Sequence, residues 1–309
     1  VAYATADPDL VRVRVNAQVR RLFKNMSSSR EESWDATEIL LFIGEPAVPQ
    51  LIDVLGEPAA ALNSSIALDL IGDRAVSGLV RHAKSRMPDV SNVFDKFLAE
   101  RKDSAVHFLV NLNWSMIGVT VAPLVTYSTV VVDVSPSLDD VLKSAAYFSP
   151  KSRSEVVEAF ALPYTWERER TFVKLAHLVS RSNQPDERRF ATLLLAEYAA
   201  EAIDVLPGLL ICLIDRDPVV AANATSALKR AGKPGVLILA RALADRGNTS
   251  KLLQRLQVRA IAVLGEIGDA DALPLLERRF RGPDHWTKDI ELSAIKQIRS
   301  RNKLPPFNP

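Results

Sequence analysis

The side chains that most often perform catalysis or bind metal ions are few in this sequence and far apart. Its four histidines, His82, His107, His177 and His285, have no metal-ligand spacing and no neighbouring cysteine or paired carboxylates. The single cysteine, Cys212, lies in the apolar run L-L-I-C-L-I, where a thiolate is disfavoured. No phosphate-binding glycine loop and no nucleophile elbow occurs. We therefore predict no metal site, no cofactor and no enzymatic activity.

Basic side chains form a more suggestive pattern. Residues 1–150 have a net charge of −4 and residues 151–309 one of +6, so the C-terminal half is the candidate for acidic partners. Four basic pairs recur in successive expected helices: Arg188 and Arg189, Lys229 and Arg230, Arg255 and Arg259, Arg299 and Arg301. We predict one stripe that attracts phosphates, anionic headgroups or an acidic protein surface. The alternative is solvated helix residues balanced by acids such as Glu197 and Glu266.

The elements that would position these residues are helices, as the stretch 256–276 shows best. Its apolar residues recur at three- and four-residue spacing and predict one buried helical face. Gly265 allows close packing and Gly268 a turn with positive φ. Asp269 or Asp271 can cap the next helix, and Pro274 fits an early turn of it.

The same pattern recurs along the chain, with its glycine at Gly44, Gly72 and Gly232. A weaker copy has Ala199 at that position, and a valine- or leucine-proline step follows at Val48, Leu206 and Leu273. One helical hairpin cannot bury its own apolar stripe, so recurrence predicts hairpins that stack on one another.

This pattern resembles the short HEAT repeats of the phycobilisome-lyase-like kind over about 31–86 and 186–301. The resemblance implies an all-α fold, an α-solenoid of HEAT-like, armadillo-like helical hairpins. It also implies that the second helix of each hairpin lines the concave surface, where the basic stripe would lie. No functional residue of the family is carried over.

Three regions follow from the patterns: an N-terminal helical block over 1–103, an irregular hydrophobic insert over 104–150, and a C-terminal helical block over 151–309. No Asp, Glu, Lys or Arg occurs from Ser104 to Val132. We expect an irregular buried insert, with short strands as one alternative and membrane contact as another. The residues that would make a hydrophobic or membrane contact are Trp114, Met116, Ile117, Leu124, Val125 and Tyr127.

The composition, 48% hydrophobic and 25% charged, is that of a folded chain, and one cysteine allows no disulfide framework. The sequence begins with Val1, so we expect its natural start to be missing. We expect a cytoplasmic location, with a membrane-associated or exported one as the alternative. The tail from Leu304 cannot extend a helix and is expected to be a loose end or a docking strap.

Repeats without a catalytic constellation indicate a non-enzymatic scaffold or adaptor that binds a protein partner. One form of this prediction is a subunit of a larger assembly. Two alternatives are a nucleic-acid-binding protein with a basic concave groove and a bilin-lyase-like chaperone or enzyme. The last would handle a pigment attached to a partner's cysteine.

Overall fold

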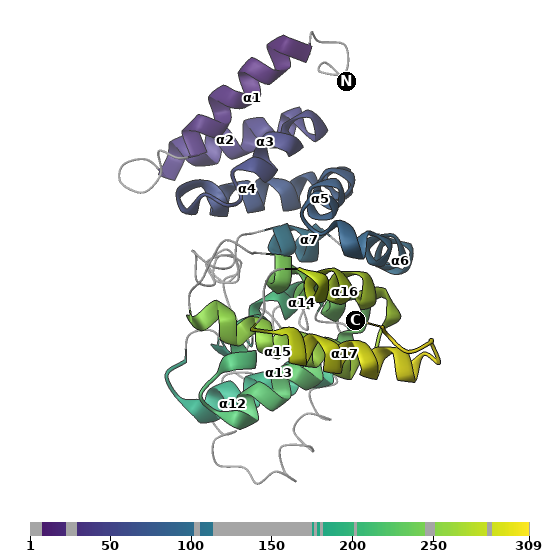
Figure 1. Ribbon diagram of the computed structural model, residues 1–309. Helices are drawn as coiled ribbons and strands as arrows, with labels where there is room; N and C mark the ends of the chain where they lie inside the picture. The colour runs from purple at the N-terminus through teal and green to yellow at the C-terminus, as the bar shows by residue number, and fades with distance from the viewer. Residues whose placement is uncertain are drawn as a thin grey trace. The chain divides into compact units, whose positions relative to one another are not determined.

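The computed structural model describes residues 8–22, 30–101, 106–113, 175, 178–179, 182–200, 203–244, 251–282 and 286–308 (Figure 1). Every regular element in these ranges is a helix, so the predicted all-α class is confirmed. The chain divides into two compact units. One consists of the described residues within Val1–Arg86 and Leu98–Pro123, and the other of those within Met87–Phe97 and Leu124–Pro309.

The N-terminal unit consists of two helical hairpins with helices packed on either side. Its elements are α1 (Pro8–Leu22), α2 (Arg30–Ile43), the 3-10 turn η2 (Glu45–Ala47), α3 (Val48–Asp53), α4 (Pro58–Ile71), α5 (Asp73–Arg86) and α7 (Val106–Asn113). Helix α2 packs on α4 and α3 on α5, while α1 packs on α2 and α7 on α5 and α4. Leu40, Leu51, Leu68 and Leu79 are fully buried between them.

Helix α7 corrects the expectation that the chain is irregular from residue 104 onward. Phe108, Leu109 and Leu112 recur at helical spacing and are buried. Asn113 is also buried, and its amide donates to the carbonyl oxygens of Leu79 at 3.1 Å and Leu109 at 2.8 Å. The strands given as an alternative for this insert find no support here. Residues 114–150 lie outside the described part of the chain.

The C-terminal unit is a two-layered array of helices. Its elements are η3 (Pro88–Val90), the beginning of α6 (Ser91–Arg101), α12 (Pro185–Glu197), η6 (Ile203–Ile214), α13 (Pro218–Ala231), α14 (Lys233–Ala244), α15 (Lys251–Ile267), η7 (Ala270–Ala272), α16 (Leu273–Arg281) and α17 (Lys288–Arg301). Helices α12, α13, α15 and α17 follow one another in one layer. Behind them, η6 packs on α13, α14 and α15, and α16 packs on α17. Helix α14 is buried all round from Pro234 to Leu243, as expected of a core helix.

The glycines that mark the repeats in the sequence share one backbone conformation. Gly44, Gly72, Gly232 and Gly268 are the glycines with positive φ in the described ranges, with values from 65° to 76°. For the first three, ψ lies between −139° and −122°, outside the left-handed helical region that asparagine tolerates. Each glycine directly follows a helix and reverses the chain into the next one. The predicted positive-φ turn is therefore confirmed.

The weaker copy around Ala199 departs from this geometry, as its sequence does. Helix α12 ends at Glu197, and Ala199 has no positive φ because its Cβ disfavours that region. The following segment, η6, is a 3-10 helix with Pro207 in its interior rather than in its first turn. Proline lacks the donor that an α-helix requires and clashes with the carbonyl four residues earlier.

The C-terminal tail packs against its own unit as a strap and is not a loose end. Lys303 has a φ of 54°, and the Leu304 amide donates to the Arg299 carbonyl oxygen at 2.9 Å. The chain thereby folds back, and Phe307 is buried edge-on against Phe280, with ring centroids 5.5 Å apart. The guanidinium of Arg281 lies 5.6 Å from the centre of the Phe307 ring.

We predict that Gly72→Ala lowers the free energy of unfolding by about 1–3 kcal/mol, the usual cost of forcing a side chain into such a conformation. The added Cβ would meet only the Asp69 carbonyl oxygen, at 3.8 Å, so backbone strain is isolated from steric clash. The measurement is urea denaturation followed by far-UV circular dichroism.

Gly56→Ala is the matched control in the same unit, because Gly56 lacks positive φ and its Cβ would meet nothing within 4 Å. Its effect should stay within about 0.5 kcal/mol. Equal effects of the two substitutions would contradict the strained turn.

Candidate functional site

All eight residues of the predicted basic stripe lie on α12, α13, α15 and α17, the neighbouring helices of one layer (Figure 1). Asparagine side chains tie neighbouring helices of this layer together. Asn223 of α13 donates to the Arg189 carbonyl oxygen of α12 at 3.0 Å, and Asn302 donates to the Gly268 carbonyl oxygen at 2.8 Å. Both contacts join residues 34 positions apart. The layer is therefore built from units of nearly constant length.

The two arginines at the beginning of α12 are held by aspartates that precede α13. Arg188 binds Asp215 through two nitrogens, at 3.0 and 3.1 Å. Arg189 binds Asp217 at 2.6 Å and Asp186 at 2.9 Å, and the hydrogen bond to Asp217 raises the pKa of the guanidinium. These pairs join the N-terminal ends of α12 and α13.

Asp217 also caps α13, accepting a hydrogen bond from the Val219 amide at 2.9 Å. Burial by itself would raise the pKa of the Asp217 carboxyl. The hydrogen bonds from Val219 and Arg189 outweigh burial, so the pKa lies below its usual value. The ionised carboxylate is thus part of the folded arrangement.

The basic residues at the opposite ends of the layer helices are also paired. Arg230 binds Glu197 at 2.6 Å, and Lys229 binds Glu266 at 3.1 Å, each to the neighbouring helix. Arg301 donates to the Glu266 carbonyl oxygen. These residues join the C-terminal ends of α12, α13, α15 and α17.

Arg255 and Arg259 differ from the other six residues. Both are exposed on α15, one helical turn apart, and neither forms an ion pair or hydrogen bond with any residue that the structure describes. The eight positions therefore do not form one continuous row. The ion-paired or hydrogen-bonded residues form two groups at opposite ends of the layer, and Arg299 lies apart from both. Between the two groups lies the open pair, by which we mean Arg255 and Arg259.

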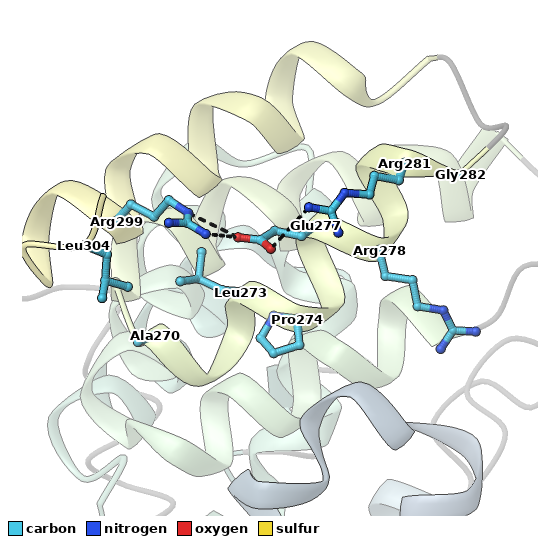
Figure 2. A pocket seen from close by; sticks show the side chains of 9 residues that line it. All are labelled: Ala270, Leu273, Pro274, Glu277, Arg278, Arg281, Gly282, Arg299 and Leu304. Atoms are coloured by element: carbon cyan, nitrogen blue, oxygen red, sulfur yellow. Dashed lines mark hydrogen bonds and ion pairs between the residues drawn. The ribbon is translucent and has the colours of Figure 1, made fainter. Parts of the chain in front are cut away.

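Arg299 lies in a pocket of about 790 Å³ on the other side of α17 (Figure 2). The lining residues come from α16, α17 and the segments that flank them: Ala270, Leu273, Pro274, Glu277, Arg278, Arg281, Gly282, Arg299 and Leu304. Arg299 donates to Glu277 at 2.7 Å and 3.1 Å and to the Pro305 carbonyl oxygen at 2.7 Å. Its three guanidinium nitrogens are therefore engaged within the chain.

The other two pocket arginines are more exposed but face carboxylates too. Arg281, with 64% of its side chain exposed, lies 4.0 Å from Glu277, and Arg278 binds Asp89 at 2.8 Å. Three cations and two carboxylates leave an excess of one positive charge. The pocket can attract an anion, but less strongly than its arginine content suggests.

The sequence analysis did not single out Glu277, Arg278 or Arg281. The sequence signal that could have identified them is the run E-R-R-F-R at the end of α16, because helical periodicity places its arginines on different faces of the helix. Arg279 of this run points inward with 4% of its side chain exposed, and its Nε donates to the buried Glu291 at 3.1 Å. A charge run thus contributes to both the surface and the interior.

Other side chains offer little reactivity in the described part of the chain. Burial raises the pKa of the Cys212 thiol to about 12, so the reactive thiolate is strongly disfavoured. No group of three His, Cys, Asp or Glu side chains in the described ranges is arranged to hold a metal ion. The hydrophobic contact residues predicted from Trp114 to Tyr127 lie outside these ranges. None of the described helices combines the length and apolar character needed to cross a membrane.

Comparison with known proteins does not extend these observations, because neither any protein-family model nor any curated protein matches the chain.

We predict that Asp217→Asn lowers the free energy of unfolding at neutral pH by about 1 kcal/mol. Asparagine still caps a helix, so the change removes mainly the charge that Arg189 binds. Because the pKa of Asp217 is lowered by folding, its contribution is present above the unfolded value near pH ~3.9 and is lost as pH falls through the folded value. Urea denaturation across this pH range should show the two proteins converging in acid.

The control is Asp53→Asn, which neutralises an exposed carboxylate of α3. Its free energy of unfolding at neutral pH should stay within about 0.5 kcal/mol of that of the unmodified protein. A difference for Asp217→Asn that persisted unchanged in acid would mean that the carboxylate charge is not the cause.

Proposed function

We propose that the protein is a non-enzymatic scaffold that binds an acidic surface of a protein partner through the exposed face of α15 and its neighbours α13 and α17. The observation that carries this proposal is the pair Arg255 and Arg259. These residues are exposed on α15 and form no ion pair within the described ranges, whereas the other basic residues of the predicted stripe are engaged with the chain.

The arginine pair has a rigid support. The opposite face of α15 is buried through Leu256, Ala260 and Leu264, against α14 and α17. Gly265 lies so close to Ala294 of α17 that an added Cβ would come within 3.0 Å of it. A partner would therefore meet guanidinium groups on a preformed surface, which lowers the entropic cost of binding.

The surroundings of the pair favour a protein partner over nucleic acid. Glu266 and Asp289 are exposed on α15 and α17, so carboxylates lie on the same layer as the arginines. A phosphate backbone is uniformly anionic and would be repelled by Asp289, whereas a protein surface can match both this carboxylate and the Lys229–Glu266 ion pair. Val258 and Ala262, both partly exposed on α15, add apolar contact beside the arginines. Arginine surrounded by apolar area is common at the centre of protein interfaces.

We further propose that each of the two units is a solenoid-like array of HEAT-like helical hairpins. Four glycines with the same positive-φ turn and inter-helix contacts 34 residues apart support repeated, equivalent hairpins. Such arrays offer extended surfaces and serve as scaffolds. The buried free thiol of Cys212 is compatible with the cytoplasmic location that we also propose.

The test is affinity capture from the native source with the double variant Arg255→Glu, Arg259→Glu. We expect the partner recovered with the unmodified protein to fall by about tenfold or more, since two attractive charges become repulsive. Recovery with the unmodified protein should also fall as salt rises from ~0.05 to ~0.5 M.

The matched control is Arg81→Glu, Arg86→Glu, which makes the same charge change at exposed positions of α5. It should retain the partner, and both variants should keep the melting temperature of the unmodified protein. A partner retained by the α15 variant would contradict the proposal. So would fluorescence anisotropy showing that duplex DNA binds at low salt and is lost only in that variant.

A further inference from the structure

Two helix ends in the N-terminal unit repeat the same surface chemistry. Helix α2 ends before Gly44 and α4 before Gly72. Phe42 and Leu70 each lie two residues before the glycine, and Glu45 and Asp73 each lie one residue after it. Each turn therefore presents an apolar residue and an acidic residue at equivalent positions.

The apolar residues at these turns are exposed. Phe42 is 73% exposed and Leu70 52%, and Ile39, one helical turn before Phe42, is 37% exposed. In the C-terminal unit the equivalent positions carry Arg230 and Glu266, which form ion pairs between neighbouring helices. The repeat thus exposes this position in both units, and in one of them it is occupied by large apolar side chains. Adjacent exposed apolar residues mark interaction sites.

We call the three exposed apolar residues the N-terminal strip: Ile39, Phe42 and Leu70. Helix α2 packs directly against α4, and both lead into a glycine turn followed by a second helix. Equivalent positions on packed neighbouring helices lie side by side, at about the interaxial distance of 8–10 Å. The packing therefore places Phe42 and Leu70 at equivalent positions on neighbouring helices, with Ile39 one turn earlier on α2.

Acidic side chains lie at both turns beside the strip, and the sequences of the two helices are acidic as well. Helices α2 and α4 together contain five acidic residues and one basic residue. Glu45 and Asp73 at the two turns are exposed, and neither forms an ion pair with a residue in the described ranges. Arg74 lies against Gly44, its guanidinium 3.2 Å from the point where a Cβ would be, and offsets part of this charge. An excess of acidic residues remains along the two helices.

From this combination we propose that the N-terminal strip docks an amphipathic, basic helix of a protein partner. Apolar side chains three and four residues apart on that helix would cover Phe42, Leu70 and Ile39, which is the usual way that a helix is recognised. Its lysine or arginine side chains would face Glu45, Asp73 and the acidic α2. This site differs in unit and in charge from the arginine pair on α15, so its partner chemistry is the opposite.

The test uses a fluorescein-labelled amphipathic helical peptide of leucine and lysine, with anisotropy as the readout. In Phe42→Ser, Leu70→Ser both apolar anchors are removed, and we expect the Kd to rise by about tenfold or more. Glu45→Lys, Asp73→Lys should raise the Kd by a similar factor at low salt and by less at high salt. A leucine and glutamate peptide of the same design should bind the unmodified protein at least about tenfold more weakly.

The matched control is Val219→Ser, Leu252→Ser, which removes two apolar residues of similar exposure from the C-terminal unit. It should leave the Kd unchanged. Melting curves of all variants should coincide, because exposed side chains contribute little to folding.

Four results would overturn the proposal: an unchanged Kd for Phe42→Ser, Leu70→Ser, an equal loss in the control, equal binding of the acidic peptide, or binding of anionic vesicles through the strip. A dimer in sedimentation equilibrium that dissociates in Phe42→Ser, Leu70→Ser would identify a second copy as the occupant and would also overturn it.

Discussion

The positive-φ turn after a helix is the constraint on which both units depend. At Gly44, Gly72, Gly232 and Gly268 the chain adopts angles that a side chain strongly disfavours, and each turn brings the following helix back against the preceding one. Helices that reverse in the same way can be stacked, so that each apolar stripe is covered by a neighbour. Where the glycine is missing, at Ala199, the positive φ is missing as well, and the segment from Ile203 is a 3-10 helix.

Once the turn is fixed, the residues beside it acquire fixed positions, and their chemistry distinguishes the two units. Two residues before the glycine, the C-terminal unit has Arg230 and Glu266, which join neighbouring helices by ion pairs. The N-terminal unit has Phe42 and Leu70 there, both exposed. The same backbone turn thus presents ion-paired charged side chains in the C-terminal unit and exposed apolar side chains in the N-terminal unit. The proposals for partner binding rest on this contrast and on the open pair Arg255 and Arg259.

The sequence predicted the helices well because their signals are local. Apolar residues at helical spacing followed by glycine predicted the helices that end just before Gly44, Gly72, Gly232 and Gly268. It predicted the basic site only in part. Which arginine is paired depends on carboxylates about 30 residues away, such as Asp217 for Arg189 and Glu197 for Arg230, and no local pattern encodes that choice. The pocket arginines were missed for a different reason: Arg278 and Arg281 differ from the buried Arg279 in the direction they face from α16, which the helical periodicity of the run could have indicated.

The most direct measurement of the central claim uses the handedness of the residue at position 232. Semisynthesis can place either L-alanine or D-alanine there, and an L-Cβ would meet no atom within 4 Å. The mirror image of the angles at Gly232 lies in the extended region that ordinary residues favour, so these backbone angles suit D-alanine and disfavour L-alanine. We predict that L-alanine lowers the melting temperature and that D-alanine leaves it unchanged or raises it. Equal melting temperatures for the two proteins would contradict the account.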